Sequence, residues 1–269
     1  MVVESAEQVE PGYLGPLREL LWQLADDDLV VAFRASEWLG LAPHVEEDVA
    51  FSSIAQDEMG HASMYFELLE ALGEGNRDDI SQLRPAVERR NAVLLEVPNG
   101  SGSYLQAPHF DWSFTIVRHY FYDVFESLRL ERLSESSYLP LAQVAQKALR
   151  EEAYHLAHQE IWMRRIASHS ADTRIRLAAA LQTAAAVAGD LTFVHPWQEL
   201  WQDYEIFPRA QSIGEAWRCQ VSGLLDELGL ALPEIGQQSN GRLGEHSPHL
   251  VVLLDTLSEV YRIDSSAKW

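Results

Sequence analysis

Apolar residues recur every three or four positions over several long stretches of the chain, which is the spacing of an amphipathic helix. The first stretch starts at Pro11 and carries an apolar stripe as far as Leu24. The spacing resumes after the run Asp26-Asp27-Asp28, includes Glu37 where an apolar residue is expected, and ends near Gly40. The aspartate run is compatible with a helix break or with a solvated face, so the helix that carries Glu37 is predicted to begin before or after it.

The same periodicity predicts further helices, and their expected ranges are 45–72, 108–133, 139–167, 171–189, 212–228 and 248–261. Residues 93–97, followed by Pro98-Asn99-Gly100, are predicted to be extended and then turned. Residues 229–244 are predicted to form a loop. No convincing pair of strands, short repeat or linker is present, which favours one all-α domain over residues 1–269.

Two Glu-x-x-His pairs stand far apart in the sequence, Glu58 with His61 and Glu152 with His155. This spacing places both side chains of a pair on one face of a helix, about one turn apart. Either pair alone is common on a solvated helix surface, but the neighbours on these two faces are largely apolar or small. The four ionisable groups are therefore predicted to point inward, where pairing or a metal ion offsets the cost of burying a carboxylate.

Two other predicted helices each offer a lone acid. Glu37 lies on the stripe of the first helix, and Asp123 lies within a run of aromatic residues. Glu126, one turn further on, is a rival ligand, a supporting group or a surface residue. Four-helix bundles hold two metal ions with Glu-x-x-His on two helices and a lone carboxylate on each of the others. The candidate ligands are therefore Glu37, Glu58, His61, Asp123, Glu152 and His155.

Four carboxylates and two imidazoles favour two iron ions, with manganese as the alternative. Zinc sites generally use fewer carboxylates, calcium prefers oxygen ligands without imidazole, and copper favours more nitrogen or sulfur. We expect the two metal ions to activate O2 for attack on a substrate in an adjacent apolar pocket. Tyr65, Tyr122 and Tyr154 lie close to ligands in the sequence and either line that pocket or pack in the core.

The charge balance narrows the range of partners. The chain has 41 Asp plus Glu against 20 Lys plus Arg, a net charge of -21, and no clustered basic surface suited to nucleic acid. The single cysteine, Cys219, excludes an intrachain disulfide and a multi-cysteine metal site. No apolar stretch approaches the roughly 20 residues that span a bilayer, and no signal peptide is evident. We expect a cytoplasmic protein without membrane or nucleic-acid partners.

Other histidines complete no Glu-x-x-His pair, and packing or surface placement explains them better: His44, His119, His158, His169 and His195. His246 and His249 flank a proline in a predicted loop and are weak candidates for binding a small molecule or a neighbouring chain. The sequence has no G-x-S-x-G, Walker or dinucleotide motif, so hydrolase, nucleotide-driven and flavin chemistries are not indicated.

With these residues identified, the chain resembles the phenylacetyl-CoA 1,2-epoxidase family, which comprises ferritin-like proteins of bacterial phenylacetate breakdown. The resemblance covers nearly the whole chain and is strongest to the C subunit. The segments that carry it are Ser36-Glu37-Trp38-Leu39-Gly40, Pro98-Asn99-Gly100, residues 118–123, residues 147–156 and residues 241–250.

The resemblance implies a ferritin-like four-helix bundle with additional C-terminal helices, within a multicomponent oxygenase. In that family an A subunit holds the di-iron centre and an aromatic acyl-CoA, the C subunit pairs with it, and a reductase supplies electrons. C subunits usually lack the ligands of the second helix. This chain instead has Asp57-Glu58-Met59-Gly60-His61, which is similar to the motif of the A subunit. The resemblance also favours Asp123 over Glu126.

Two functions follow from these observations. The first is a di-iron oxygenase component that inserts oxygen into an aromatic acyl-CoA or a related substrate. It works with a related ferritin-like subunit, or as a homo-oligomer, and with a reductase. The second is a non-catalytic subunit that supports a separate catalytic one. The intact pair Glu58 and His61 distinguishes them, because a pure scaffold has no physical need for it. An iron-storage cage fits the broken, aromatic C-terminal segments less well.

Overall fold

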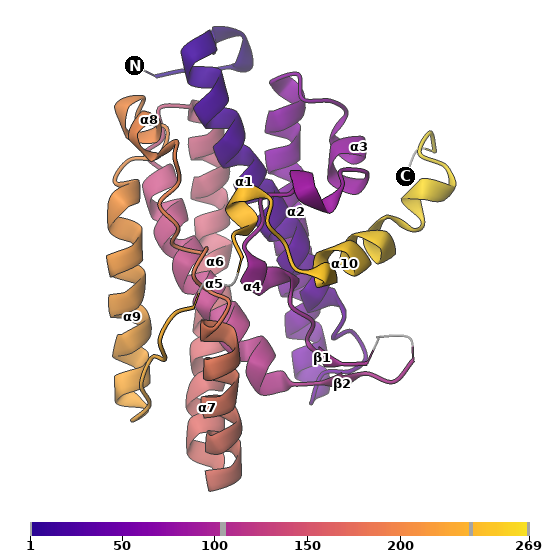
Figure 1. Ribbon diagram of the computed structural model, residues 1–269, viewed down its shortest axis with the longest axis vertical. Helices are drawn as coiled ribbons and strands as arrows, with labels where there is room; N and C mark the ends of the chain where they lie inside the picture. The colour runs from indigo at the N-terminus through magenta and orange to yellow at the C-terminus, as the bar shows by residue number, and fades with distance from the viewer. Residues whose placement is uncertain (1, 103–105, 237–238, 268–269) are drawn as a thin grey trace.

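The computed structural model describes residues 2–102, 106–236 and 239–267, and these residues are mostly helical. Four long helices form an elongated bundle (Figure 1): α1 Pro11–Ser36, α2 Val45–Ala71, α5 Trp112–Leu133 and α6 Leu139–His169. The expected all-α, ferritin-like bundle is thereby confirmed.

The bundle is built from two helical hairpins. Helix α1 packs against α2, α5 packs against α6, and α2 also contacts α6. The connections within each hairpin are short, so the paired helices run antiparallel. The long crossover between the hairpins carries small elements: α3 Arg77–Gln82, α4 Val93–Glu96, β1 Gly100–Ser101 and β2 His109–Phe110.

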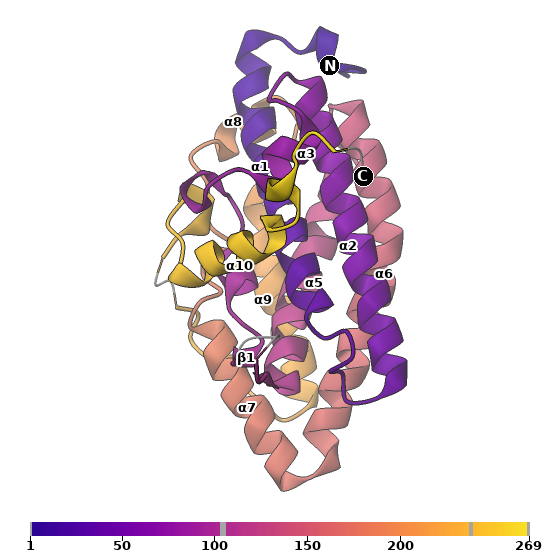
Figure 2. The same ribbon diagram turned by 90° about the vertical axis from the view of Figure 1, so that its right-hand side faces the viewer.

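In the described part of the chain after the bundle, four further helices follow: α7 Ala171–Ala185, α8 Gln198–Asp203, α9 Ile213–Glu227 and α10 Pro248–Ser258. Helices α7 and α9 both contact α5. Trp217 of α9 is almost fully buried and donates its indole N–H to the backbone oxygen of Phe121 at 2.8 Å. Helix α10 and the β1–β2 hairpin project from the same side of the bundle, as Figures 1 and 2 show. Among the described helices, none combines the length and apolarity needed to cross a bilayer.

Helix α1 runs without a break through Asp26, Asp27 and Asp28, and all three side chains are buried. The aspartate run is therefore neither a helix break nor a solvated face. Asp26 is paired with Arg84 and Arg89, at 2.9 and 3.0 Å. Because these arginines neutralise the carboxylate, the helix retains its geometry in a buried, acidic stretch.

Residues 93–97 also differ from expectation, because Val93–Glu96 forms one turn of helix and not an extended segment. Its N-terminus is held by an acid from far along the chain: the backbone N–H of Val93 donates to Asp190 at 2.9 Å. A short strand pair then follows, in which Gly100 lies opposite Phe110. A Cβ at Gly100 would lie 2.3 Å from the backbone oxygen of His109, so glycine permits the close approach of the two strands.

The strand pair also explains why α5 starts later than expected. Residues just before Trp112 belong to β2, and Asp111 caps the helix by accepting a hydrogen bond from the N–H of Phe114 at 3.2 Å. The other long helices begin and end within a few residues of the predicted positions.

Candidate metal centre

Helices α2 and α6 place their two Glu-x-x-His pairs face to face in the middle of the bundle. Glu58, His61, Glu152 and His155 are all at most 2% exposed. The Nδ1 atom of His155 lies 3.0 Å from Glu152 and 3.4 Å from Glu58, so it contacts carboxylates of both helices. The Nδ1 atom of His61 lies 3.7 Å from Glu58 and 4.0 Å from Glu152. Both imidazoles therefore direct Nδ1 toward the shared centre.

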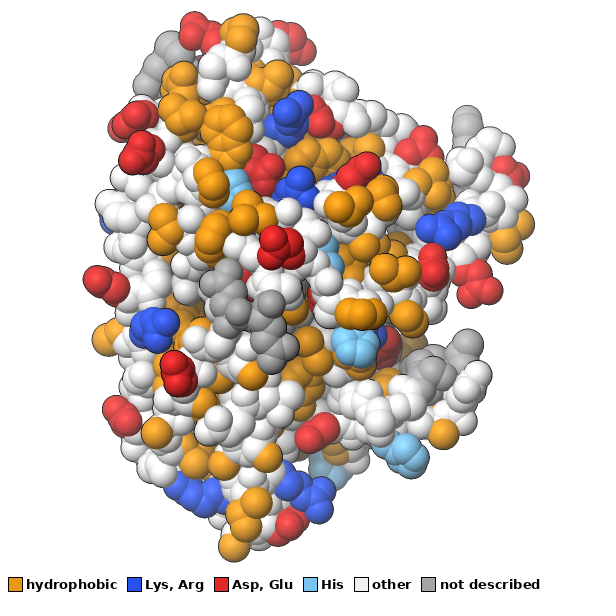
Figure 3. Space-filling model, in the orientation of Figure 1, with side chains coloured by type: hydrophobic (Ala, Val, Ile, Leu, Met, Phe, Trp, Pro, Cys, Tyr) orange, Lys and Arg blue, Asp and Glu red, His pale blue; other side chains and the backbone are white. Residues whose placement is uncertain are grey.

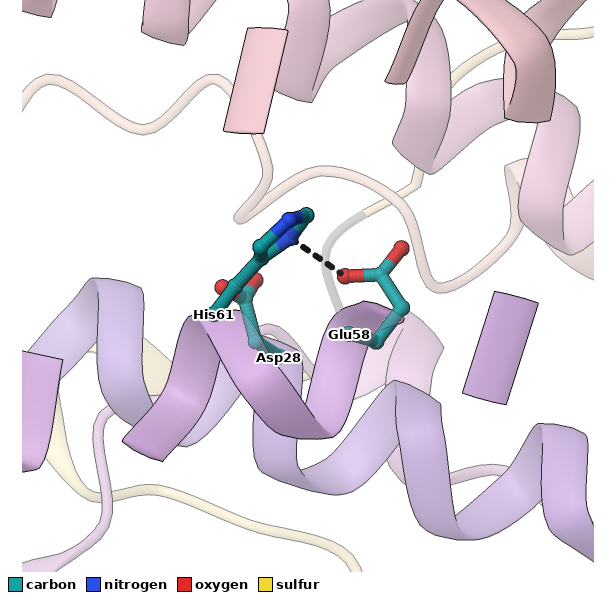
Figure 4. A group of neighbouring side chains, drawn as sticks. All are labelled: Asp28, Glu58 and His61. Carbon is teal, nitrogen blue, oxygen red and sulfur yellow. Dashed lines mark ion pairs between the residues drawn. The ribbon is translucent and has the colours of Figure 1, made fainter. Parts of the chain in front are cut away.

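Two groups of potential ligand atoms share Glu58. Asp28, Glu58 and His61 form one group, shown in Figure 4, and Glu58, Glu152 and His155 form the other. Within each group the ligand atoms lie within 4.8 Å of one another. If the centre holds two cations, the residues of these two groups would be their ligands, and Glu58 would belong to both sets.

The outer nitrogen of each imidazole contacts an acid on the opposite helix. Nε2 of His61 lies 2.6 Å from Glu151, and Nε2 of His155 lies 3.3 Å from Asp57. The two acids are partly exposed, at 34% and 38% of their side-chain areas. Metal-binding histidines commonly hold their second nitrogen in this way, which fixes the orientation of the ring.

Helix α5 contributes two buried acids, Asp123 and Glu126. Asp123 is fully buried, and the charges of Glu152, His155 and Glu58 all act on it. Glu126 accepts a hydrogen bond from Nε of Arg129 at 2.6 Å, and its charge acts on Asp28. Arg129 occupies one oxygen of Glu126, whereas both oxygens of Asp123 lack a hydrogen-bond partner among the described residues, so Asp123 is the better candidate ligand.

The centre contains more carboxylates than its basic side chains can neutralise. Burial raises the pKa of Asp28, and the charges of Glu126 and Glu58 raise it further. Burial likewise raises the pKa of Asp123, with Glu152 adding to the effect. For Glu58 burial acts in the same direction, but contact with His155 and His61 lowers its pKa to about 2. Such a cluster requires positive charge, which bound protons or metal ions supply.

Carboxylate oxygens from all four bundle helices are buried without a hydrogen-bond partner among the described residues: Asp28 Oδ2, both oxygens of Glu58, both oxygens of Asp123 and Glu152 Oε2. A buried acceptor without a partner costs about 1–3 kcal/mol, so clusters of them are rare without a ligand. Their positions, around two imidazoles, fit a pair of cations with oxygen-rich coordination.

The structure does not bring Glu37 into this group. Glu37 lies just after the last residue of α1, nine residues or about 13 Å along the helix axis from Asp28. Its carboxylate accepts hydrogen bonds from Arg34 and Asn99, both at 2.7 Å. On α1 it is Asp28 that lies beside Glu58 and His61.

Sequence reasoning missed Asp28 because its neighbours, Asp26 and Asp27, made the segment resemble a break. The signal was present in the helical spacing, since Asp28 follows Leu24 by four residues and precedes Val31 by three. It also missed the acids Asp57 and Glu151, each of which directly precedes the glutamate of a Glu-x-x-His pair.

The three tyrosines that lie close to candidate ligands in the sequence differ in burial. Tyr154 is 79% exposed and does not line the centre. Tyr122 is buried and donates its hydroxyl hydrogen to Asp28 at 2.6 Å. Tyr65 is also buried, and its hydroxyl has no hydrogen-bond partner within the described ranges. Tyr65 and Tyr122 therefore belong to the surroundings of the acids.

Comparison with known proteins gives a consistent result. The chain is 27% identical over 249 residues to the C subunit of the 1,2-phenylacetyl-CoA epoxidase of Escherichia coli (strain K12), a match that covers 92% of this chain and 96% of the relative. The family described as "Phenylacetic acid catabolic protein" matches residues 1–269. Because that match spans the whole chain, the resemblance noted in the sequence is confirmed, and the chain belongs to the phenylacetic acid catabolic protein family.

Proposed function

We propose that this chain is the di-iron component of an oxygenase system similar to phenylacetyl-CoA epoxidase. The observation that carries the proposal is a set of buried carboxylate oxygens from four helices that have no hydrogen-bond partner among the described residues and lie around two inward-facing imidazoles. The residues proposed to hold the metal ions are Asp28, Glu58, His61, Asp123, Glu152 and His155.

The protein side chains orient these ligands and exclude water from them. Glu151 and Asp57 hold the outer nitrogens of His61 and His155, so each ring keeps Nδ1 directed inward before any metal binds. The ligands are buried by the four helices, and a water-poor site strengthens the electrostatic interactions within it. Arg129 holds Glu126 aside by pairing with its carboxylate.

Iron held by these residues would supply redox chemistry by which O2, two electrons from a reductase and two protons yield an oxygenated organic substrate and one water molecule. The name of the E. coli relative supports an aromatic acyl-CoA as the substrate and a multi-subunit assembly as the setting. We propose a related ferritin-like subunit and a reductase as partners, with manganese as the alternative metal.

A second function is favoured by the identity of that relative, which is a C subunit. In this alternative the chain supports a separate catalytic subunit and needs no metal of its own. The two functions differ in one measurable quantity, the number of metal ions bound per folded chain.

The test is metal analysis of protein purified after expression in iron-supplemented medium. We expect about two irons per chain in the natural protein, and loss of that iron in Glu58→Ala and His61→Ala. His169→Ala is the matched control, because His169 is exposed at the end of α6 and should leave the iron content unchanged. Circular dichroism establishes that each variant is folded. A folded, metal-free natural protein would support the scaffold function instead.

Turnover gives the second measurement. With a reductase and a related subunit present, the iron-loaded chain should consume O2 in a phenylacetyl-CoA-dependent manner, and the two metal-site variants should not. If the variants sustain the same turnover as the natural chain, the catalytic iron lies in another subunit.

A further inference from the structure

Helices α2 and α6 meet along one edge of the bundle, where Figure 2 shows them side by side. We call the line along which they meet the α2–α6 seam. The two helices belong to different hairpins, and they contact each other less extensively than each contacts its hairpin partner. Two contacts across the seam reach proposed ligands, those of Glu151 with His61 and of Asp57 with His155. The seam is therefore a boundary between two structural units directly outside the centre.

At the seam, the contacts of the proposed metal centre reach solvent. The six proposed ligands are at most 2% exposed. Within the described residues, the side chains that bond to these ligands are also buried, with the exception of Asp57 and Glu151. The side chains of these two acids are 38% and 34% exposed. A cation that reaches either carboxylate is thus separated from the buried acids by one imidazole.

Other sides of the bundle are covered by further elements. Helices α7 and α9 pack on α5, and helices α4 and α8 pack on α1. On the face that Figure 3 shows, acidic side chains are scattered among apolar and uncharged ones and form no continuous patch. A cation therefore meets acids that contact the proposed ligands at the α2–α6 seam.

Carboxyl groups stand on both sides of the two imidazoles at the seam. Asp57 and Glu151 contact the outer nitrogens, and Glu58 and Glu152 lie on the inner side. Both oxygens of Glu58 and one oxygen of Glu152 are buried without a hydrogen-bond partner among the described residues. The chain as a whole carries a net charge of -21. Acids of this kind raise the local concentration of cations and the rate at which they associate.

The contacts on either side of these acids are less suited to receive a cation. Toward the end of α2, the ammonium of Lys147 lies 3.8 Å from Sδ of Met64. Toward the start of α2, Nε2 of His158 lies 2.7 Å from Glu47, which is only 8% exposed. The positive charge of Lys147 repels a cation. The partly exposed acids between these two contacts, Asp57 and Glu151, are therefore the groups that a cation meets first.

We propose that divalent metal ions enter the centre through the α2–α6 seam, and that Asp57 and Glu151 bind the ion first and transfer it to the ligands inside. This inference rests on the proposed metal centre. Passage requires a transient opening between the hairpins, which the limited contact of α2 with α6 favours. The two acids then set how fast the ion arrives, in addition to orienting the imidazoles.

The test measures how fast Co²⁺ binds to the metal-free protein in the absence of O2. Co²⁺ stands next to Fe²⁺ in its affinity for nitrogen and oxygen ligands, and its absorption reports binding in a stopped-flow instrument. Asp57→Asn/Glu151→Gln should slow association by about tenfold or more and reduce its dependence on salt. Glu46→Gln/Glu259→Gln is the matched control, because it removes the same charge from two exposed acids elsewhere and should leave the rate nearly unchanged.

A second variant obstructs the seam and leaves every acid in place. Gly60 is exposed, lies one turn after Asp57 on α2, and a Cβ there would meet nothing within 4 Å. Gly60→Trp should slow association and dissociation of Co²⁺ by the same factor, because an obstacle on the path acts in both directions and leaves the affinity unchanged. Gly223→Trp is the control, since Gly223 is an exposed glycine of α9 with equally open surroundings, and both rates should stay the same.

Two results would overturn the entry path and leave the metal centre intact. In the first, the natural chain binds about two Co²⁺ ions, and the double acid variant and Gly60→Trp bind them at the natural rate. In the second, the double acid variant loses affinity through faster dissociation alone, so that Asp57 and Glu151 only orient the imidazoles. A natural chain that binds no Co²⁺ at equilibrium would refute the metal centre and the path together. Circular dichroism establishes that each variant is folded.

Discussion

His61 and Glu151 are joined across the bundle, with Nε2 of His61 2.6 Å from Oε2 of Glu151. The same relationship occurs in reverse between His155 of α6 and Asp57 of α2. Helices α2 and α6 therefore each hold the imidazole of the other, and each uses the acid that precedes its own Glu-x-x-His pair. In the proposed metal site, affinity should therefore depend on Glu151 and Asp57 as well as on the ligands.

Glu151→Gln should weaken metal binding by about 10–100-fold, because the neutral amide holds His61 less firmly and makes it a weaker ligand. Competition with a chromophoric chelator measures the change. Glu46→Gln is the control, since Glu46 is an exposed acid of α2 outside the centre. Unchanged affinity in Glu151→Gln would show that this contact does not support the site.

Substitutions of Asp28, within α1, and of Glu37, just after its end, should affect metal content differently. Asp28→Asn should lower the metal content from about two ions per chain to about one, because Asp28 belongs to the group with His61. Glu37→Gln should leave the content at two, because Glu37 is paired with Arg34 outside the centre. Plasma emission spectrometry gives the stoichiometry. The opposite result would restore Glu37 as the ligand from α1.

Metal binding should release protons and strengthen as pH rises. Burial alone would lower the pKa of His61, but contact with Glu58 raises it to about 10. Burial acts likewise on His155, and Glu152 together with Glu58 raises its pKa to about 12. Both imidazoles are therefore protonated at neutral pH without metal, and they must lose those protons to bind it.

The stability of the metal-free protein should change with pH in the opposite direction: it should fall as pH rises. Protonated His61 stabilises the metal-free protein fully below its unfolded pKa of about 6.5, and this contribution is lost as pH rises toward 10. Calorimetric titration of a divalent metal in buffers of different ionisation enthalpy measures the protons released. An affinity that does not change between pH 6 and 8, with no proton release, would contradict these charge states.

Arg129→Met should destabilise the fold by about 3–5 kcal/mol, because it leaves the buried carboxylate of Glu126 without its cation and leaves Asp27 with Arg242 alone. Arg129 lies 2.8 Å from Asp27 and 2.6 Å from Glu126, and it is 1% exposed. Urea unfolding of the metal-free protein measures the loss. Arg164→Met provides the comparison, since its ion pair with Glu227 is exposed to solvent and should contribute little to stability. Equal effects of the two changes would show that the buried pairs do not stabilise the fold.

The sequence predicted the bundle well because helical periodicity is local information. The ranges of α2 and α6 were predicted to within about two residues at each end. The turn at Val93–Glu96 was missed because its N-terminus depends on Asp190, almost a hundred residues away. No local pattern contains that hydrogen bond.

Part of the candidate site could also be predicted from local helical spacing. Glu58, His61, Glu152 and His155 were found through spacing alone, and the structure places them together. Asp28 was missed because burying three consecutive aspartates is plausible only when the partners of its neighbours are known. Those partners include Arg84 and Arg129, which are distant in sequence and meet α1 only in the folded chain.

The pairing of Asp27 with Arg242, at 2.8 Å, has a consequence for the order of events during synthesis. Arg242 is synthesised more than 200 residues after Asp27. Until Arg242 is made, Asp27 and Glu126 must share the single cation of Arg129, so burying both acids costs more than in the complete fold. Chains truncated before Arg242 should therefore expose α1 to proteases and chaperones more than chains that include it.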